Sequence, residues 1–369
     1  MNKICVYAIC KNEQKFVDKW LSSMCEADYI VVLDTGSTDE TYNLLKNDER
    51  VFRVEQKVIN PWRFDVARNE SLKLVPEDAN ILLCTDLDEV LEPGWADEIR
   101  ENWQDGFHVR GNYLYAWSHN EIGEPARIFY YDKLHDKNWH WEAPVHEMLT
   151  ANEYNDEYID QHTLVLSEKV FLHHYPDNTK SRSSYLPLLE LRAEERPDDY
   201  YGIFYLAHEQ YYRGQYKKSI NTLNYLLTNF SDKFNTIETA AAYLFLGDNY
   251  RNLNDDKAAL LHYQQAINID ETYREPYLLA AEVCNQMKMY NLAIGYVKEA
   301  LQKTYRHYNW LERDNSWLGQ VDDILSISYY YTGEIQRSYC HCLTALKFNP
   351  DDQRIIYNEK FIKNELLNK

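Results

Sequence analysis

The first third of the chain alternates short apolar runs with amphipathic stretches. The apolar runs span residues 4–9, 29–33, 51–54 and 81–85, and the stretches with helical periodicity between them span 15–24, 41–45 and 66–74. Such an alternation is typical of a largely parallel sheet with helices on its faces. The pattern therefore predicts an α/β, Rossmann-like domain at the start of the chain.

Polar clusters follow three of these predicted strands, at residues 11–13, 34–37 and 86–89. In open α/β sheets, ligands bind beyond the carboxyl ends of the strands. We therefore expect the three clusters to meet at one edge of the sheet and to form a single site.

From about residue 200, small residues recur on helical patterns. Two series show the same separations of 40, 34 and 45 residues: Ala207, Gly247, Ala281 and Ser326, and Ser219, Ala259, Ala293 and Ser338. A 34-residue period with small residues where paired helices touch is typical of tetratricopeptide repeats. The longer separations indicate insertions. We expect an all-α solenoid of stacked helix pairs whose last helix ends before Pro350.

The two patterns divide the 369 residues into an α/β domain at 1–178, a linker helix at 179–198 and a repeat domain at 199–369. The net charge of −20 argues against nucleic acid as a partner, because phosphate would be repelled over most of the surface. A bound phosphate therefore needs a cation close by. No run reaches the roughly 18 apolar residues of a membrane helix, so no integral membrane segment is expected.

The seven cysteines show no C-x-x-C spacing. Their odd number and irregular spacing favour reduced thiols in a cytoplasmic protein.

Asp86 and Asp88 directly follow the apolar run at 81–84, and their side chains point the same way because side chains alternate along a strand. Two such carboxylates suit Mg²⁺ or Mn²⁺, which binds one or two protein carboxylates together with phosphate oxygens. An acidic turn is the more frequent meaning of an isolated D-x-D. The position at the expected ligand edge favours the metal.

Arg68 lies in the first turn of a predicted helix and supplies the required cation. It can clamp a diphosphate or simply pair with a neighbouring acid. Asp65 can cap the same helix or accept a hydrogen bond from a ribose or base. The segment 34–41 also opens a helix, so it is either a nucleotide-binding helix start or an ordinary capping box.

Four segments, in this order and spacing, resemble the family 2 inverting glycosyltransferases: 6–13, 34–39, 64–69 and 86–89. The resemblance is greater to the subset with C-terminal repeats, the sublancin S-glycosyltransferase group. It covers about residues 4–215 by motif and the whole chain by architecture. It implies a GT-A fold followed by a tetratricopeptide-like solenoid, and a nucleotide-diphosphate sugar as donor.

The resemblance also implies a divalent metal, Mn²⁺ or Mg²⁺, held through Asp88 of the D-x-D element, with Asp34 near the nucleoside; the D-x-D pattern itself adds Asp86 as a candidate metal ligand. The expected nucleotide-sugar-binding residues are Asn12, Asp34, Asp65, Arg68, Asn69, Asp86 and Arg127. Many relatives carry two acids before the Gly-Ser-Thr of the second segment. Here the second is Thr35, which leaves open which group reads the base.

Segments 127–129 and 144–147 resemble elements that follow the metal motif in the same subset. An inverting transfer needs a base for the acceptor's proton, and His146, Glu147 and Glu89 are the candidates. A purely structural role for His146 is the alternative. In many GT-A enzymes a histidine near the end of the domain completes the metal coordination. Here His173 and His174 are both candidates for this ligand, and we favour His173.

The expected function is transfer of a hexose or N-acetylhexosamine from a nucleotide-diphosphate sugar, most simply a UDP-sugar, to a peptide or protein acceptor. Repeats of this type usually recognise peptides, and they often dimerise, so a homodimer through the repeat domain is also expected. The alternatives are a cell-surface glycan or polymer as acceptor, or a non-catalytic scaffold with a degenerate transferase domain. A nucleotidyltransferase would need a Gly-rich basic loop near the N-terminus, which the sequence lacks.

Overall fold

The computed structural model describes residues 2–120, 123–177, 179–306, 311 and 313–367. The chain forms two compact units, of which the first ends at Glu195 and the second begins at Arg196. Each is described by itself. Helix α6 (Tyr185–Glu195), which the sequence assigned to a linker at 179–198, packs as part of the first unit. Nowhere in the described ranges is there a helix long and apolar enough to cross a membrane.

The elements of the first unit that precede α6 are β1 (Ile4–Cys10), α1 (Val17–Met24), β2 (Tyr29–Asp34), α2 (Thr41–Asn47), β3 (Arg53–Gln56), α3 (Phe64–Leu72), β4 (Ile81–Cys84), β5 (Glu89–Leu91), α4 (Trp95–Asn102), β6 (Arg110–His119), β7 (Pro125–His135), β8 (Trp139–Glu142), β9 (Met148–Ala151), α5 (Asp156–Gln161), β10 (Thr163–Val165) and β11 (Phe171–His174). Each strand and helix predicted up to residue 85 is present, with ends shifted by at most two residues. The α/β class is therefore confirmed.

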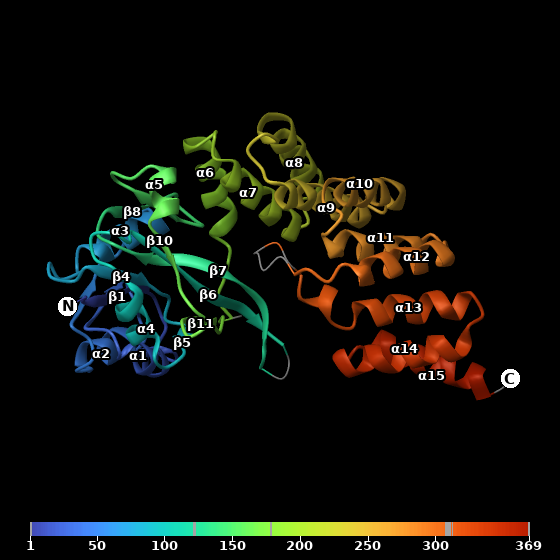
Figure 1. Ribbon diagram of the computed structural model, residues 1–369, viewed down its shortest axis with the longest axis horizontal. Helices are drawn as coiled ribbons and strands as arrows, with labels where there is room; N and C mark the ends of the chain where they lie inside the picture. The colour runs from blue at the N-terminus through green and yellow to red at the C-terminus, as the bar shows by residue number, and fades with distance from the viewer. Residues whose placement is uncertain (1, 121–122, 178, 307–310, 312, 368–369) are drawn as a thin grey trace. The chain divides into compact units, whose positions relative to one another are not determined.

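The strands of the larger sheet run in the order β3-β2-β1-β4-β7-β6-β11-β5, with β10 beside β6, and β8 and β9 form a separate two-stranded sheet. Figure 1 shows β4, β7, β6 and β11 within the first unit. Strands β3, β2, β1 and β4 are parallel, so their carboxyl ends meet at one edge. Strand β7 runs antiparallel to β4, which makes the whole sheet mixed. The parallel half is what brings the three polar clusters together.

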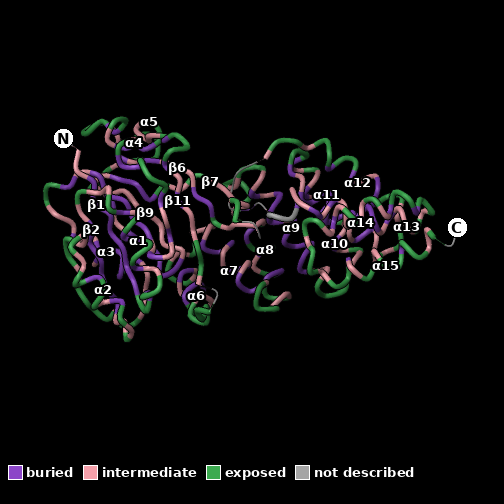
Figure 2. Tube along the Cα trace, turned by 90° about the horizontal axis from the view of Figure 1, so that it is seen from below, coloured by how far each residue is buried: buried purple, intermediate pink, exposed green. Residues whose placement is uncertain are grey.

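Strand β1 is buried along its whole length (Figure 2). Its alternate side chains enter two cores. One core lies between the sheet and helices α1 and α4 and contains Trp20 and Trp95. The other lies under α3 and contains Tyr7 and Trp141. A strand covered on both faces is held rigidly, so the loops at its carboxyl end start from a fixed position.

The second unit is helical. Its elements are α7 (Tyr200–Tyr212), α8 (Tyr216–Phe230), α9 (Thr236–Asn252), α10 (Asp256–Ile269), α11 (Arg274–Gln286), α12 (Tyr290–Gln302), the short η1 (Asp314–Trp317), α13 (Gln320–Tyr331), α14 (Ile335–Phe348) and α15 (Gln353–Leu367). The first series of small residues falls on α7, α9, α11 and α13, and the second on α8, α10, α12 and α14. The longest separation in each series contains η1.

The small residues lie where paired helices touch. Ser219 Oγ donates to the carbonyl of Ala207 at 2.8 Å. Ser338 Oγ makes the same bond to Ser326 at 2.7 Å. Glycine is required at 247, because a Cβ there would lie 2.4 Å from the Tyr263 ring of α10. These repeated contacts confirm the tetratricopeptide-like solenoid.

One detail of the repeat prediction is wrong. Helix α15 follows Pro350 and packs against α14 through Ile355 and Ile362. Proline ended α14 as expected, but the apolar positions beyond it bury a further helix on the end of the stack.

Candidate active site

The turn after β4 carries the two acids of the D-x-D motif, and Glu89 holds this turn. Glu89 Oε2 accepts from the backbone N–H of Asp86 at 2.8 Å, and its Oε1 accepts from the Tyr115 hydroxyl at 2.9 Å. Burial and the nearby Asp86 raise the pKa of Glu89 to about 7. Glu89, one of the candidate bases, thus has both carboxylate oxygens engaged within the turn.

Arg68 links this turn to the 144–147 segment. Its side chain is 2% exposed, and it donates to Asp86 Oδ1 at 2.7 Å and to Glu147 Oε1 at 2.9 Å. Burial favours the neutral guanidine, but the two carboxylates outweigh it and raise the pKa of Arg68. The guanidinium also lies 5.5 Å from the centre of the Trp141 ring. A permanent cation therefore lies directly beside the D-x-D motif.

The structure distinguishes the two adjacent histidines at the end of β11. His174 Nε2 lies 3.5 Å from Asp88 Oδ2, and its Nδ1 lies 3.1 Å from the carbonyl of Trp117. His173, named first from the sequence, instead contacts Glu92 and His119, each at 3.0 Å. Successive side chains of a strand point to opposite faces, so only one of the pair can reach Asp88.

Two opposing effects act on the pKa of His174. Burial favours the neutral imidazole, but the hydrogen bond to Asp88 and the charge of that carboxylate raise the pKa of His174 above its ordinary value.

Asp34, at the end of β2, shapes the loop that follows. It is fully buried, and its Oδ1 accepts from the backbone N–H of Gly36 and Ser37 at 2.9 and 2.7 Å and from Gln56 Nε2 at 3.0 Å. Gly36 has a φ of 105°, which suits glycine. One carboxylate oxygen of Asp34 is thus used to build the loop.

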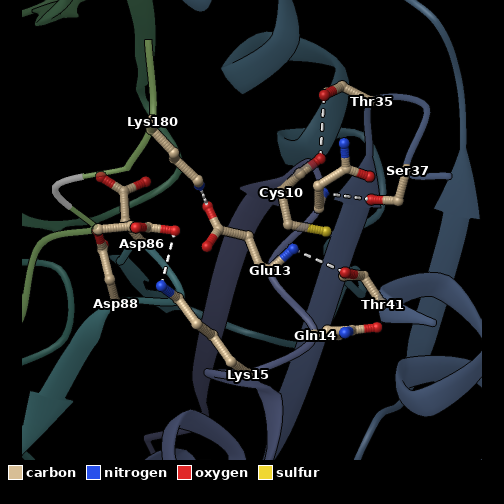
Figure 3. Close-up of polar contacts among 12 residues, drawn as sticks. Cys10, Glu13, Gln14, Lys15, Thr35, Ser37, Thr41, Asp86, Asp88 and Lys180 are labelled. Atoms are coloured by element: carbon tan, nitrogen blue, oxygen red, sulfur yellow. Dashed lines mark hydrogen bonds and ion pairs between the residues drawn. The ribbon is translucent and has the colours of Figure 1, made fainter. Parts of the chain in front are cut away.

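Asn12 and Glu13, which follow β1, lie beside the loop after β2. Asn12, with a φ of 56°, donates through its N–H to Ser37 Oγ and accepts from the N–H of Thr38, at 2.8 and 2.7 Å. Glu13 is buried and pairs with Lys180, which reaches it from the segment after β11 (Figure 3). Lys180 was not singled out in the sequence, because only the tertiary fold brings it to β1.

Asp65 and Asn69 both hold α3 in place. Asp65 pairs with Arg63 at 2.9 Å, and Arg63 also reaches Glu195 of α6 at 2.7 Å. The Asn69 amide donates to the backbone carbonyl of Trp141 at 2.8 Å and accepts from its N–H at 2.9 Å. The structure therefore shows both predicted nucleotide-sugar residues bonded to neighbouring protein groups.

Arg127 lies near the start of β7, and its N–H donates to Ser118 Oγ at 3.2 Å. Farther along the same strand, Leu134 pairs with Leu83 of β4. Arg127 and Leu134 are seven positions apart, which corresponds to about 23 Å of strand. Arg127 thus lies near the turn of the β6–β7 hairpin, where its partner in the register is Ser118, the residue after Trp117.

The 143–147 segment has an unusual backbone. Ala143 and His146 have φ values of 78° and 48°, a region that non-glycine residues rarely adopt. The His146 ring lies edge-on to Tyr185 of α6, with centroids 5.8 Å apart. Burial lowers the pKa of His146 to about 4, so its imidazole is neutral at physiological pH.

Lys133 is a further cation that the sequence reasoning missed. It is 7% exposed and lies over the Tyr131 and Trp141 rings, 4.8 and 5.7 Å from their centres. In the sequence it is one charge within a strand. Its burial depends on β8 folding back over the sheet, which no local pattern predicts.

A family model described as Glycosyl transferase family 2 matches residues 5–164. These residues belong to glycosyl transferase family 2. The family 2 domain contains Arg68, the D-x-D motif and Glu147, and this confirms the family expected from the motifs. His174 and helix α6 lie beyond residue 164. No curated protein matches the chain.

Solved structures that resemble part of the chain are tetratricopeptide proteins. A thermophilic repeat protein of Thermus thermophilus is 17% identical, with 48% of this chain and 88% of that one covered and a TM-score of 0.36. A repeat protein of Parabacteroides merdae is 14% identical, with 48% and 64% covered and a TM-score of 0.38. The repeat domain of Arabidopsis OM64 is 12% identical, with 35% and 98% covered and a TM-score of 0.31.

Proposed function

We propose that this protein is a metal-dependent, inverting glycosyltransferase that moves a hexose or N-acetylhexosamine from a UDP-sugar to a peptide or protein side chain. The observation that carries the proposal is the Arg68–Asp86 pair at the carboxyl end of β4 in a family 2 domain. It combines a permanent cation and a carboxylate where a diphosphate and its metal would bind.

The residues beside this pair suit a divalent cation. His174 Nδ1 lies against the Trp117 carbonyl and can keep its proton there, so loss of the Nε2 proton would leave a lone pair for a metal beside Asp88. In the described part of the chain, no three His, Cys, Asp or Glu side chains are grouped as a complete metal site. A metal held by Asp88 and His174 would therefore take further ligands from the diphosphate, as Mg²⁺ and Mn²⁺ usually do. When bound, it would neutralise charge on the departing diphosphate.

Side chains of the protein supply the other functions of the site. Arg68 stabilises the anionic leaving group from its fixed position, because both of its carboxylate contacts hold the guanidinium in place. Glu89 keeps the turn in shape through its bonds to Asp86 and Tyr115. Asp34 and Asn12 hold the loop at 36–38 that would border the nucleoside.

We assign the general base to Glu147. Glu89 has both oxygens engaged and the His146 ring packs against Tyr185 of α6, whereas Glu147 is bound to Arg68 beside the D-x-D motif. Burial opposes ionisation of Glu147, but Arg68 outweighs it and lowers the pKa, so the carboxylate stays charged. It would accept the acceptor's proton as the acceptor oxygen or sulfur attacks the anomeric carbon and the bond to the diphosphate breaks.

The peptide or protein acceptor is proposed from the repeat unit, since stacked helix pairs form extended binding surfaces for peptides. The cytoplasmic location and a homodimer through the repeat unit are proposals that rest on the sequence.

The test is thermal unfolding of the wild type and Asp88→Ala with a panel of nucleotide-diphosphate sugars, with and without Mn²⁺. Asp97→Ala is the matched control, because it removes an exposed carboxylate on α4. A ligand at 100 times its Kd stabilises the native state by about 2.7 kcal/mol, so one donor should raise the melting temperature of wild type and control only with metal. Absence of any shift in the wild type would favour the non-catalytic scaffold.

A further inference from the structure

Arg192 of α6 is an arginine whose side chain is fully buried beside the candidate site. Its Nη1 donates to the backbone carbonyls of Val145 and His146 at 2.9 and 2.6 Å, and its Nη2 lies 3.4 Å from Met148 Sδ. A buried guanidinium is costly unless hydrogen bonds replace its water. These three partners lie in or next to the 143–147 segment, so Arg192 binds this segment directly.

The 143–147 segment needs such support. Ala143 and His146 both adopt positive φ values, a conformation that persists only when the surroundings hold it. From one side, the backbone N–H of Phe64 in α3 donates to the Pro144 carbonyl at 3.0 Å. From α6, Arg192 binds the next two carbonyls. The segment is therefore held between two helices.

This segment positions its last residue, Glu147. Its carboxylate accepts from Arg68 Nε, and the other end of the same guanidinium binds Asp86. A continuous chain of contacts runs from Arg192 through the backbone at 145–146 to Glu147, then to Arg68 and the D-x-D motif. Its first member lies 28 residues beyond the family 2 match, which ends at 164.

We propose that Arg192 is a positioning residue for glycosyl transfer, and that helix α6 thereby completes the catalytic unit of this chain. Arg192 holds the carbonyls of Val145 and His146 so that Glu147 stays on Arg68 and Arg68 stays on Asp86. This inference rests on the proposed transferase function. A simple packing role for Arg192 would stabilise α6 without affecting turnover, and the experiment is designed to separate the two.

The experiment measures release of nucleoside diphosphate from the donor chosen by the thermal panel, with water as acceptor. The variants are Arg192→Ala, Arg192→Lys and Glu147→Gln. Leu189→Ala is the matched control, because Leu189 is also fully buried on α6 but has an apolar side chain that cannot bind the carbonyls. Hydrogen exchange of the amides at 145–148 is measured in parallel, since it does not depend on activity.

We expect Arg192→Ala to lower kcat by about 10- to 100-fold with a smaller change in the donor KM, because misplaced groups affect the reacting geometry most. Arg192→Lys should restore part of the rate, since an ammonium can still donate to a carbonyl. In the Glu147→Gln background, Arg192→Ala should lower kcat by less than about twofold further, because the two residues act through one network. Leu189→Ala should lower the melting temperature but keep kcat within about twofold of wild type.

Faster exchange at 145–148 in Arg192→Ala, together with the loss of turnover, supports the proposal. Turnover of Arg192→Ala equal to that of Leu189→Ala would overturn it. If the wild type releases no diphosphate from any donor, the proposed function fails and exchange alone decides the positioning. In that case, unchanged exchange at 145–148 in Arg192→Ala also overturns the role of Arg192.

Discussion

Arg68 Nε donates to Glu147 Oε1 at 2.9 Å, and this bond joins two residues 79 positions apart in the sequence. The same guanidinium binds Asp86, so three charges from three segments form one network around the buried Arg68 side chain. The network is the centre of the candidate site. Its single cation, Arg68, lies between two carboxylates, and the first prediction concerns the loss of that cation.

Arg68→Ala should strongly destabilise the first unit. The substitution leaves Asp86 and Glu147 without their buried partner, and breaking a buried pair in this way costs about 3–5 kcal/mol. Urea unfolding followed by circular dichroism measures the loss. Arg100→Ala, which removes a partly exposed pair with Asp28, should cost no more than about 1 kcal/mol. Equal effects of the two substitutions would contradict a special role for the Arg68 network.

The two adjacent histidines should behave differently towards metal. His174→Ala should abolish the Mn²⁺-dependent stabilisation by the donor, because Nε2 of His174 is the imidazole nitrogen beside Asp88. His173→Ala should retain it, because His173 faces Glu92 and His119. Thermal unfolding with donor and Mn²⁺ compares the pair. The reverse result would return the assignment to His173.

Stability should fall as the pH drops from about 6.5 to about 4. Burial lowers the pKa of His135 from 6.5 to about 4, so between these values the unfolded chain binds the proton and the folded chain does not. The full effect is on the order of 3 kcal/mol. Urea unfolding of wild type and His135→Asn at pH 7.5 and 4.5 measures it, and the variant should lose less stability between the two values. His140→Gln, at a partly exposed position, should retain the wild-type dependence.

Glu147→Gln should lower the rate of sugar transfer by about 10²- to 10⁴-fold, the usual range for loss of a general base. His146→Gln should have a smaller effect, because the His146 ring packs against Tyr185 whereas Glu147 is bound to Arg68 beside the D-x-D motif. Transfer rates at saturating donor, measured from pH 6 to 9, compare the two. A larger loss in His146→Gln would move the base to the histidine.

Two glycines of the repeat unit should respond oppositely to alanine. Gly247→Ala brings a Cβ to 2.4 Å from the Tyr263 ring and should destabilise the unit by about 1–3 kcal/mol. Gly295 lies within α12, and an added Cβ meets nothing within 4 Å. Gly295→Ala should therefore stabilise the unit by up to about 1 kcal/mol through helix propensity. Urea unfolding measures both, and destabilisation by Gly295→Ala would contradict the predicted packing.

Local pattern predicted a large part of this fold. Apolar runs and helical periods located the strands and helices up to residue 85, because burial on a strand or helix face imposes its period on the sequence. The repeating small residues located the helix pairs for the same reason, since Ser219 and Gly247 occupy contacts that larger side chains would block. The polar clusters indicated the edge of the site, because parallel strands bring their carboxyl ends together.

The partners within the site depended on the tertiary structure. The sequence could not choose between His173 and His174, because the choice depends on which face of β11 turns towards Asp88. It also missed Lys133 and placed Arg192 only in a linker, because their roles arise when β8 and α6 pack against distant parts of the chain. The sequence shows that a residue is charged but not how deeply it is buried or which charges lie beside it. Burial and neighbouring charges determine its pKa and its role, and both depend on the packing of separate elements.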